Sequence, residues 1–553
     1  MQQKILKYFF YISFFGAIAL IGFYGYIVLK YSTNAPFFDD FFWGFTFLDE
    51  YISADSFKEK IRLIFQQHAQ HRIAYFRLFI VGHYHLLGTI NFKNIAIFAN
   101  ISNLIVFAIL VKLLFKHGFL KYLLLPIALV LFQFQYYQNI ISSYGFPNMA
   151  VYMWVFLAFY FNSLMGRKNL IYTLLCAILA AFSNGNGVLA FPILLFFLFL
   201  QNRFADLKIA GLILGIFLLF YFALANDMAT QPINVLNSAN YLIKFLSAAF
   251  FTGHFKLEFL ATVLMLICFI GLLLKDIYKR FFYNKAIVFD QIWLFITPVL
   301  LWILATALSV AVFRATPEAN IPNWYFNYSI LFIICFAIYF INGLKNSYLI
   351  SFIVLGFTSY GISNYYKNLT NILPTIHGFH SNLEADIVNF KQHKKWSFLL
   401  TQVSYPMYQK FEKLTNKFYD KGIFKLDEVA PNLITSSSKT SLNTKHFMVE
   451  ESINNELKVS FLEGKDLPEN SFGFIKSATE TYYFGVGKLL NNSKKEIIFG
   501  KALFDNKPFF VVGKTYFDIA IKAGEYNFGF VFFDKKGNQK WYTTEQKIKI
   551  ENY

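Results

Sequence analysis

The sequence contains little charge and very little cysteine. Only 15% of its 553 residues are Asp, Glu, Lys or Arg, whereas 56% are hydrophobic. A soluble chain of this length needs apolar residues mainly in its core and would be far more polar. The three cysteines, Cys176, Cys268 and Cys335, all fall inside apolar segments, so neither a disulfide framework nor a metal cluster is indicated. The composition indicates a membrane protein.

Long apolar runs recur through the first two thirds of the sequence, which lacks internal repeats, low-complexity tracts and heptad arrays. Each run has about 20 residues, the length a helix needs to cross the hydrocarbon layer. Much of the net charge of +18 falls in short loops, where basic residues signal topology rather than nucleic-acid binding. Lys4 and Lys7 precede the run 8–29, which shows no small-x-small cleavage site, so we expect a retained span rather than a signal peptide.

The apolar runs predict eleven membrane spans. With the N-terminus in the cytoplasm, the inward loops hold the basic residues, and the outward loops 138–146 and 184–186 have no Lys or Arg. The short segment 73–90, with two histidines and Arg77, is predicted to be an interfacial helix, and a short second span is the alternative. The predicted spans are 8–29, 95–115, 119–137, 147–163, 169–183, 187–200, 208–225, 258–274, 291–312, 325–341 and 348–363.

The C-terminal third is more polar, and an odd number of spans places it outside. Residues 380–420 have a helical pattern, whereas the sequence beyond about 440 alternates like short strands, with a turn at Gly537-Asn538. We therefore predict a polytopic α-helical membrane domain followed by a small antiparallel β-sandwich-like domain on the outer face. The predicted boundaries are 1–365 for the membrane domain, 366–425 for a helical connector and 426–553 for the β-rich domain.

Two adjacent carboxylates, Asp39 and Asp40, lie among aromatic residues just beyond the first span. They are costly to desolvate unless they meet a cation, a proton or a hydrogen-bonding substrate. Such a carboxylate can act as a general base for a hydroxyl or help to hold a divalent cation. Consecutive side chains point in different directions, so we expect one of the two, with a slight preference for Asp40, to face a site. A helix cap with a solvated neighbour is the alternative.

The same outer loop contains QQHAQHRIAYFR, with His68, His71, Arg72 and Arg77. Two histidines three residues apart can bind a metal, but no third ligand stands at a diagnostic spacing. Arginine binds phosphate through two parallel hydrogen bonds, so a phosphate site fits this segment better. A basic helix lying on lipid headgroups is the alternative.

Three other outer loops are short and polar, and we expect them to converge with the acidic pair on one face. They are Ser142–Asn148, Ser183–Gly187 and Phe313–Tyr325, the last of which carries Arg314. Each of them taken alone also fits a simple turn between helices.

These residues together resemble the C-type glycosyltransferase superfamily (GT-C). The resemblance covers about 30–340 and rests on Asp39-Asp40, on HAQHRIAYFRL, and on SYGFPNMAVYMWV and SNGNGVLAFP. HAQHRIAYFRL is similar to the H-x-E-H-R-x-x-x-x-R-L stretch of one bacterial branch. This chain departs from that branch at Gln70, where Glu is usual, and at Trp324-Tyr325, where an Arg-Tyr pair is expected, which leaves Arg314 as the nearest arginine.

The resemblance implies inverting sugar transfer at the outer face of the bacterial inner membrane, from a polyprenyl-phosphate-linked sugar to an envelope glycan or protein. One of Asp39 and Asp40 would be the general base, and no cofactor is firmly implied, although a divalent cation remains an option. The alternatives are a lipid-linked glycan transporter or polymerase, and a non-catalytic membrane anchor for a binding β-domain. Residues expected at the substrate and its lipid phosphate are His68, His71, Arg72, Arg77, Arg314 and Tyr325.

Overall fold

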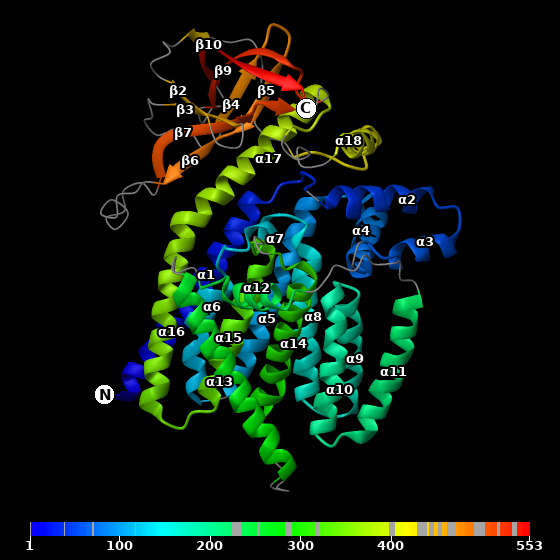
Figure 1. The fold of residues 1–553 in the computed structure, drawn as a ribbon, viewed down its shortest axis with the longest axis vertical. Helices are drawn as coiled ribbons and strands as arrows, with labels where there is room; N and C mark the ends of the chain where they lie inside the picture. The colour runs from blue at the N-terminus through cyan, green and yellow to red at the C-terminus, as the bar shows by residue number, and fades with distance from the viewer. Residues whose placement is uncertain are drawn as a thin grey trace.

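The chain forms a helical body beneath a C-terminal β-domain (Figure 1). The computed structural model describes residues 2–552 except 38, 69–70, 117, 224–233, 251–254, 283–289, 317–319, 398–403, 428–438, 442–446, 452–455, 462–470, 491–503, 517–519 and 534–538. The helices are α1 (Gln2–Tyr31), η1 (Phe41–Thr46), α2 (Phe47–Ser53), α3 (Phe57–Phe65), α4 (Ala74–Leu87), α5 (Phe92–Lys116), η2 (Gly118–Leu123), α6 (Leu124–Leu131), α7 (Tyr137–Ile141), α8 (Gly145–Ser163), α9 (Arg167–Ala181), η3 (Gly185–Leu189), α10 (Ala190–Leu200), α11 (Phe204–Ala223), α12 (Val235–Ser247), α13 (Phe255–Phe282), α14 (Gln291–Arg314), η4 (Asn323–Tyr325), α15 (Phe326–Asn342), α16 (Ser347–Lys367), η5 (Asn368–Ile372), α17 (Leu373–His393) and α18 (Tyr405–Asp420).

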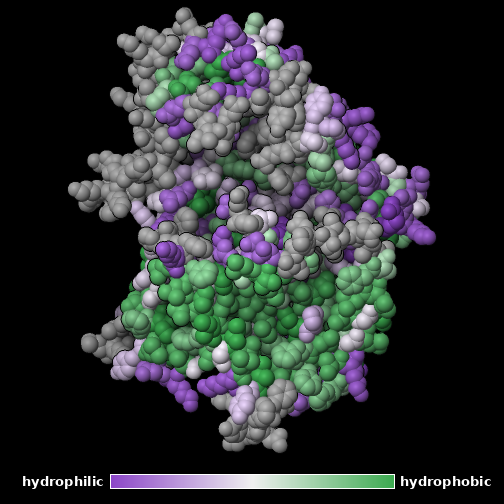
Figure 2. All heavy atoms as spheres, viewed as in Figure 1, coloured by the Kyte–Doolittle hydropathy of each residue, from purple (hydrophilic) through white to green (hydrophobic). Residues whose placement is uncertain are grey.

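Several helices are long and apolar enough to cross a membrane, which confirms the membrane class. Figure 2 shows hydrophobic side chains covering the helical body as a broad belt, with hydrophilic residues above and below it. The described residues contain six such helices: Phe10–Tyr31, Phe92–Lys116, Phe204–Ala223, Lys256–Tyr278, Gln291–Arg314 and Asn323–Asn342.

The remaining predicted spans correspond to shorter or less apolar helices, so the number of crossings stays a prediction. The predicted span 119–137 differs most from the structure, because its α-helix α6 ends at Leu131. Polar residues follow, and they bind another part of the chain: Gln133 accepts a hydrogen bond from Asn368, and Gln135 donates one to Asn364. The predicted interfacial segment 73–90 forms helix α4, and its place relative to a bilayer also stays a prediction.

Buried polar side chains link several segments of the helical body to one another. Asn103 on α5 donates hydrogen bonds of 2.9 Å to the hydroxyls of Tyr24 on α1 and Tyr136, and accepts one of 2.5 Å from Tyr152 on α8. Hydrogen bonds of this kind stabilise helix packing where lipid offers no polar partner.

The β-domain consists of two sheets that share one core. A six-stranded sheet has the order β1-β10-β9-β4-β5, with β8 beside β10, and a four-stranded sheet has the order β2-β3-β7-β6. Phe461 and Phe510 from the smaller sheet pack against Phe530 from the larger one, so the sheets face each other. The strands are β1 (Lys439–Ser441), β2 (Phe447–Glu451), β3 (Glu456–Phe461), β4 (Ser471–Lys476), β5 (Thr481–Gly485), β6 (Gly487–Leu490), β7 (Phe504–Gly513), β8 (Thr515–Tyr516), β9 (Gly524–Phe533) and β10 (Gln539–Asn552).

The antiparallel character predicted for this domain is confirmed for most strand pairs, whereas β1 and β8 each pair with β10 in parallel. The predicted turn at Gly537-Asn538 lies outside the described residues, although Gln539 pairs with Phe533 across β10 and β9.

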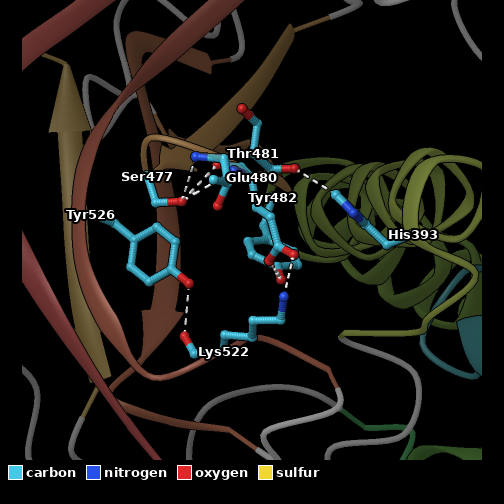
Figure 3. A network of polar contacts seen from close by, with 8 residues as sticks. His393, Ser477, Glu480, Thr481, Tyr482, Lys522 and Tyr526 are labelled. Carbon is cyan, nitrogen blue, oxygen red and sulfur yellow. Dashed lines mark hydrogen bonds and ion pairs between the residues drawn. The ribbon is translucent and has the colours of Figure 1, made fainter.

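Helix α17 follows α16 and η5 in the chain, and it forms hydrogen bonds with the β-domain. The Asn389 side chain donates to the carbonyl of Tyr483 and accepts from its N–H, both at 2.8 Å. At the end of α17, His393 Nε2 donates to the Thr481 carbonyl at 2.8 Å, beside the 2.7 Å ion pair between Glu480 and Lys522 (Figure 3). The β-domain is therefore attached at several points rather than tethered by one linker.

Helix α18 lies against the outer loop that carries the acidic pair. Phe411 packs on the rings of Phe41 and Phe42 at 5.0 and 4.6 Å, and Lys417 forms a 2.5 Å ion pair with Asp49. Helix α18, which belongs to the predicted helical connector, therefore packs on the loop that follows α1.

Candidate functional site at the outer ends of the helices

Asp40 is fully buried at the start of the π-helical segment η1. Its Oδ2 accepts hydrogen bonds from the Phe37 N–H at 2.8 Å and from the Ser143 hydroxyl at 2.5 Å. Its exposed fraction is 0%, and its Oδ1 is buried without a hydrogen-bond partner among the residues that the structure describes. Burial raises the pKa of Asp40 to about 7, although the hydrogen bonds from Ser143 and Phe37 oppose the shift.

Asp39 differs from its neighbour because its side chain remains partly exposed. Burial raises the pKa of Asp39 to about 6, and the positive charge of Arg314 acts against that rise. Arg314 is the exposed last residue of α14, and its guanidinium lies 5.8 Å from the centre of the Tyr325 ring. Among the ion pairs between described residues, none joins Asp39 to Arg314.

Aromatic rings connect Asp39 with the other outer loops. Trp43 stacks on Tyr144 at 5.6 Å with an interplanar angle of 14°, and Tyr144 meets Trp324 edge-on at 5.5 Å. The charges of Asp39 and Arg314 both act on the pKa of Tyr144, in opposite directions: Asp39 raises it and Arg314 lowers it. Three loops that are distant in sequence therefore meet here.

Amide side chains join the same loops. Asn148 Oδ1 accepts from Asn184 Nδ2 at 3.0 Å, and Asn139 Nδ2 donates to the Trp324 carbonyl at 2.9 Å. The tight turn from α9 into η3 requires Gly187, because a Cβ there would lie 2.0 Å from the carbonyl oxygen of Ala180. The structure thus brings these loops together, whereas their position on the outer face stays a prediction.

His68 and His71 lie beside this cluster and form a tight backbone bridge, with N–H to carbonyl distances of 2.8 and 2.9 Å. The His68 ring meets Trp43 edge-on at 5.7 Å. Burial lowers the pKa of each histidine to about 4, and Arg314 contributes to the shift at His71. Both imidazoles are therefore neutral at pH 7. Gln70, at which the chain departs from the bacterial branch, lies outside the described residues.

Arg77 is 6% exposed and binds backbone carbonyls at the end of helix α3. Its Nη1 donates to the carbonyls of Leu63, Ile64 and Gln66 at 2.8, 3.4 and 2.5 Å. These groups lack partners within the helix because an α-helix leaves its last carbonyls unpaired. This geometry supports a structural role for Arg77, since its Nη1 is already occupied.

Arg72, 2% exposed, also binds the end of α3, through a 2.8 Å hydrogen bond from Nη1 to the Phe65 carbonyl. Its guanidinium lies 4.9 Å from the centre of the Tyr221 ring on α11, and its Nε and Nη2 have no hydrogen-bond partner. The three expected arginines thus divide into two groups: Arg314, whose charge acts on Asp39, and the pair Arg72 and Arg77, which bind carbonyls at the end of α3.

Sequence reasoning did not identify Ser143 or Trp43 as parts of the site. Ser143 lies in a loop that was singled out, but its pairing with Asp40 crosses 103 residues. Trp43 lies three residues beyond Asp40 in a run of aromatic residues, and the sequence offered no reason to assign this ring, rather than its neighbours, to the site. Among the described residues, no group of three or more His, Cys, Asp or Glu side chains is arranged to hold a metal ion.

Comparisons with protein-family models, with curated proteins and with solved structures found no match for this chain.

Proposed function

We propose that the chain is a membrane glycosyltransferase of the C type, which transfers a sugar from a polyprenyl-phosphate donor to an envelope glycan or protein. The observation that carries this proposal is the arrangement of Asp39 and Arg314. A partly exposed carboxylate with a raised pKa lies within electrostatic range of an exposed guanidinium, which ends the apolar helix α14 beside an aromatic ring. Perturbed pKa values of this kind cluster at functional sites.

Asp39 is the proposed general base. A pKa of about 6 leaves it mostly ionised at pH 7 and close to the value at which a base is most effective. It removes the proton from the acceptor hydroxyl as that oxygen attacks the anomeric carbon. The new C–O bond forms while the bond from that carbon to the phosphate oxygen breaks, and the polyprenyl phosphate leaves with the electron pair. The configuration at the anomeric carbon is inverted.

Asp40 is better suited to positioning than to proton transfer. Its carboxylate is buried and bound by Ser143 and by the Phe37 N–H, so it fixes the start of η1 against the Ser142–Asn148 loop. We therefore propose Asp39 as the base, in place of Asp40, which the sequence slightly favoured.

Arg314 is the proposed partner of the lipid phosphate, because a guanidinium can neutralise the charge that develops on the leaving group. Arg72 has two nitrogens, Nε and Nη2, without partners among the described residues, whereas Arg77 has only Nε in that state and its Nη1 is held by α3. Tyr325 lies beneath the Arg314 guanidinium and orients it.

The proposal includes a topology. The chain crosses the inner membrane of a bacterial cell eleven times, with its N-terminus in the cytoplasm and the β-domain outside. The basic residues of the inward loops and the scarcity of basic residues in two outward loops support this orientation. The polar α17, α18 and outer loop all lie on the β-domain side of the apolar belt (Figure 2).

The test is sugar transfer by the purified full chain in lipid nanodiscs, with radiolabelled short-chain prenyl-phosphate sugars and a bacterial envelope extract as acceptor. We expect Asp39→Asn to abolish transfer. Asp49→Asn is the matched control, because Asp49 lies in the same loop but pairs with Lys417. No transfer by the wild type from any donor of the panel, or full transfer by Asp39→Asn, would refute the proposal. If the chain is instead a non-catalytic membrane anchor for a binding β-domain, the wild type should transfer no sugar from any donor.

A further inference from the structure

Helix α3 lies crosswise at the end of α11 that is nearer the β-domain (Figure 1). Helix α11 is apolar and long enough to span a membrane, and its Ile216, Leu219 and Phe220 are 61%, 75% and 45% exposed. Phe65, the last residue of α3, meets the Phe220 ring edge-on at 5.8 Å. Helix α3 therefore lies at the edge of the apolar belt and does not cross it.

Three apolar side chains form a stripe along α3. Phe57, Ile61 and Phe65 are spaced by four residues, so they lie on one side of the helix. Phe57 is 80% exposed and Ile61 is 39% exposed, whereas Phe65 packs on α11 and on the ring of Phe182 at 5.1 Å. Because Phe65 turns this side of the helix towards α11, Phe57 and Ile61 continue the exposed apolar surface of that helix.

The other sides of α3 differ from the stripe and from one another. Leu63 and Ile64 are buried against the protein. Lys58 and Arg62, which are exposed and also four residues apart, lie on the side next to the stripe. Glu59, which pairs with Arg62 at 3.1 Å, lies on the far side from the stripe. Around the helix, one side therefore meets protein, the next is apolar, the third is basic and the last is acidic.

This order fits a helix that lies parallel to a bilayer with one flank against protein. The apolar side of such an interfacial helix enters the boundary between headgroups and acyl chains. A lysine beside it keeps its stem in the apolar layer and its ammonium group at the headgroups. An exposed apolar surface that is contiguous with the belt is costly in water, and lipid covers it without that cost.

Helix α3 is also joined to the candidate site. Arg77 donates hydrogen bonds to the last carbonyls of α3, and Phe76, the residue before it, meets Trp43 of η1 edge-on at 6.0 Å. A membrane contact at α3 would therefore act on the loop that carries Asp39.

We infer that α3 is an interfacial anchor whose partner is the phospholipid bilayer. Phe57 and Ile61 insert into the leaflet on the β-domain side, Lys58 lies at the level of its headgroup phosphates, and Glu59 faces water. The anchor holds the loop that carries Asp39 at the membrane surface. The inference concerns lipid contact alone and does not depend on the proposed sugar transfer.

Spin labels measure this depth directly in the full chain, reconstituted in nanodiscs of phosphatidylcholine and phosphatidylglycerol. A nitroxide is attached at Phe57→Cys, or at Glu59→Cys as the matched control on the far side of the same helix. Leu219→Cys on α11 is the reference for a side chain that faces lipid. Access of each label to oxygen, which concentrates in lipid, and to a water-soluble nickel chelate gives its depth. The three native cysteines are replaced in every variant: Cys176→Ala, Cys268→Ala and Cys335→Ala.

We expect the label at position 57 to lie about 5–10 Å below the headgroup boundary, with more access to oxygen than to the chelate. The label at position 59 should have more access to the chelate, and one attached at Lys58→Cys should lie between the two. Thermal unfolding checks that each variant is folded. If the chain without cysteine does not fold, Phe57→Trp and Glu59→Trp in the otherwise native chain repeat the comparison. Brominated phospholipids should then quench the added fluorescence at position 57 and not at position 59.

Two results would overturn the inference. Equal access of positions 57 and 59 to the chelate, or equal quenching of the two added tryptophans, would show that the stripe faces water. A label at position 57 that neither reagent reaches would show that protein rather than lipid covers the stripe. Neither result bears on sugar transfer, which is measured separately.

Discussion

Replacing Arg77 by Met tests whether this arginine stabilises helix α3 or binds a phosphate. The side chain is 6% exposed, and its Nη1 makes two short hydrogen bonds, to Leu63 and Gln66, and a longer one to Ile64. A hydrogen bond from a charged donor contributes about 1.5–3 kcal/mol. The freed carbonyls regain some water at the helix end, so we expect a local loss of about 3 kcal/mol.

Hydrogen exchange followed by mass spectrometry measures this loss directly. A destabilisation of about 3 kcal/mol corresponds to amide exchange in α3 that is about a hundredfold faster. Arg62→Met is the matched control: Arg62 lies on the same helix, but its side chain is exposed and pairs only with Glu59. Such surface pairs contribute about 0–1 kcal/mol, so little change is expected. The structural role would be refuted if the amides of α3 exchanged at the wild-type rate in Arg77→Met while this variant no longer bound prenyl phosphate.

Three further predictions concern pH and packing. Transfer should rise with pH through about 6, and Arg314→Gln should move this rise to higher pH, because Arg314 favours the ionised form of Asp39; an unchanged pH–rate profile would contradict this. The pKa of Asp40 is raised from 3.8 to about 7, so the folded state binds the additional proton and the contribution of this group to stability falls between about pH 4 and 7. As the pH rises over that range, the thermal unfolding temperature should therefore decline less in Asp40→Asn than in the wild type. Equal declines in the two proteins would contradict a raised pKa of Asp40. Gly187→Ala should lower the unfolding temperature sharply, since its Cβ would clash with a backbone carbonyl, whereas Gly215→Ala, with nothing within 4 Å, should have little effect.

The sequence predicted the membrane class and the C-terminal sheets because their signals are local. Apolar runs such as 291–312 are long enough to identify a crossing helix without knowledge of its neighbours. Alternation in segments such as YNFGFVFFD (526–534) likewise marks a strand within a few residues, and β9 (Gly524–Phe533) includes residues 526–533 of it. The break in the predicted span 119–137 was not visible, because Gln133 and Gln135 find their partners more than 200 residues away.

The candidate site was located by its residue types, but the roles within it depend on distant partners. Asp39 and Asp40 are adjacent and chemically identical, and only the hydrogen bond from Ser143 and the charge of Arg314 distinguish them. The sequence suggested that Arg77 binds phosphate. It does not reveal that α3 ends at Phe65, so it could not show that Arg77 binds the carbonyls at that helix end. Pairwise geometry across the chain, rather than local pattern, decides each of these roles.

The most direct test of the account is the ratio of transfer rates of Asp39→Asn and Asp40→Asn, measured at pH 7.5 with saturating donor in nanodiscs. General base catalysis contributes about 10²- to 10⁴-fold, so Asp39→Asn should lose at least a hundredfold in rate. Asp40→Asn keeps an oxygen that can accept from Ser143, and it should stay within about tenfold of the wild type if its role is to position η1. A larger loss in Asp40→Asn than in Asp39→Asn would contradict the assignment of Asp39 as the base.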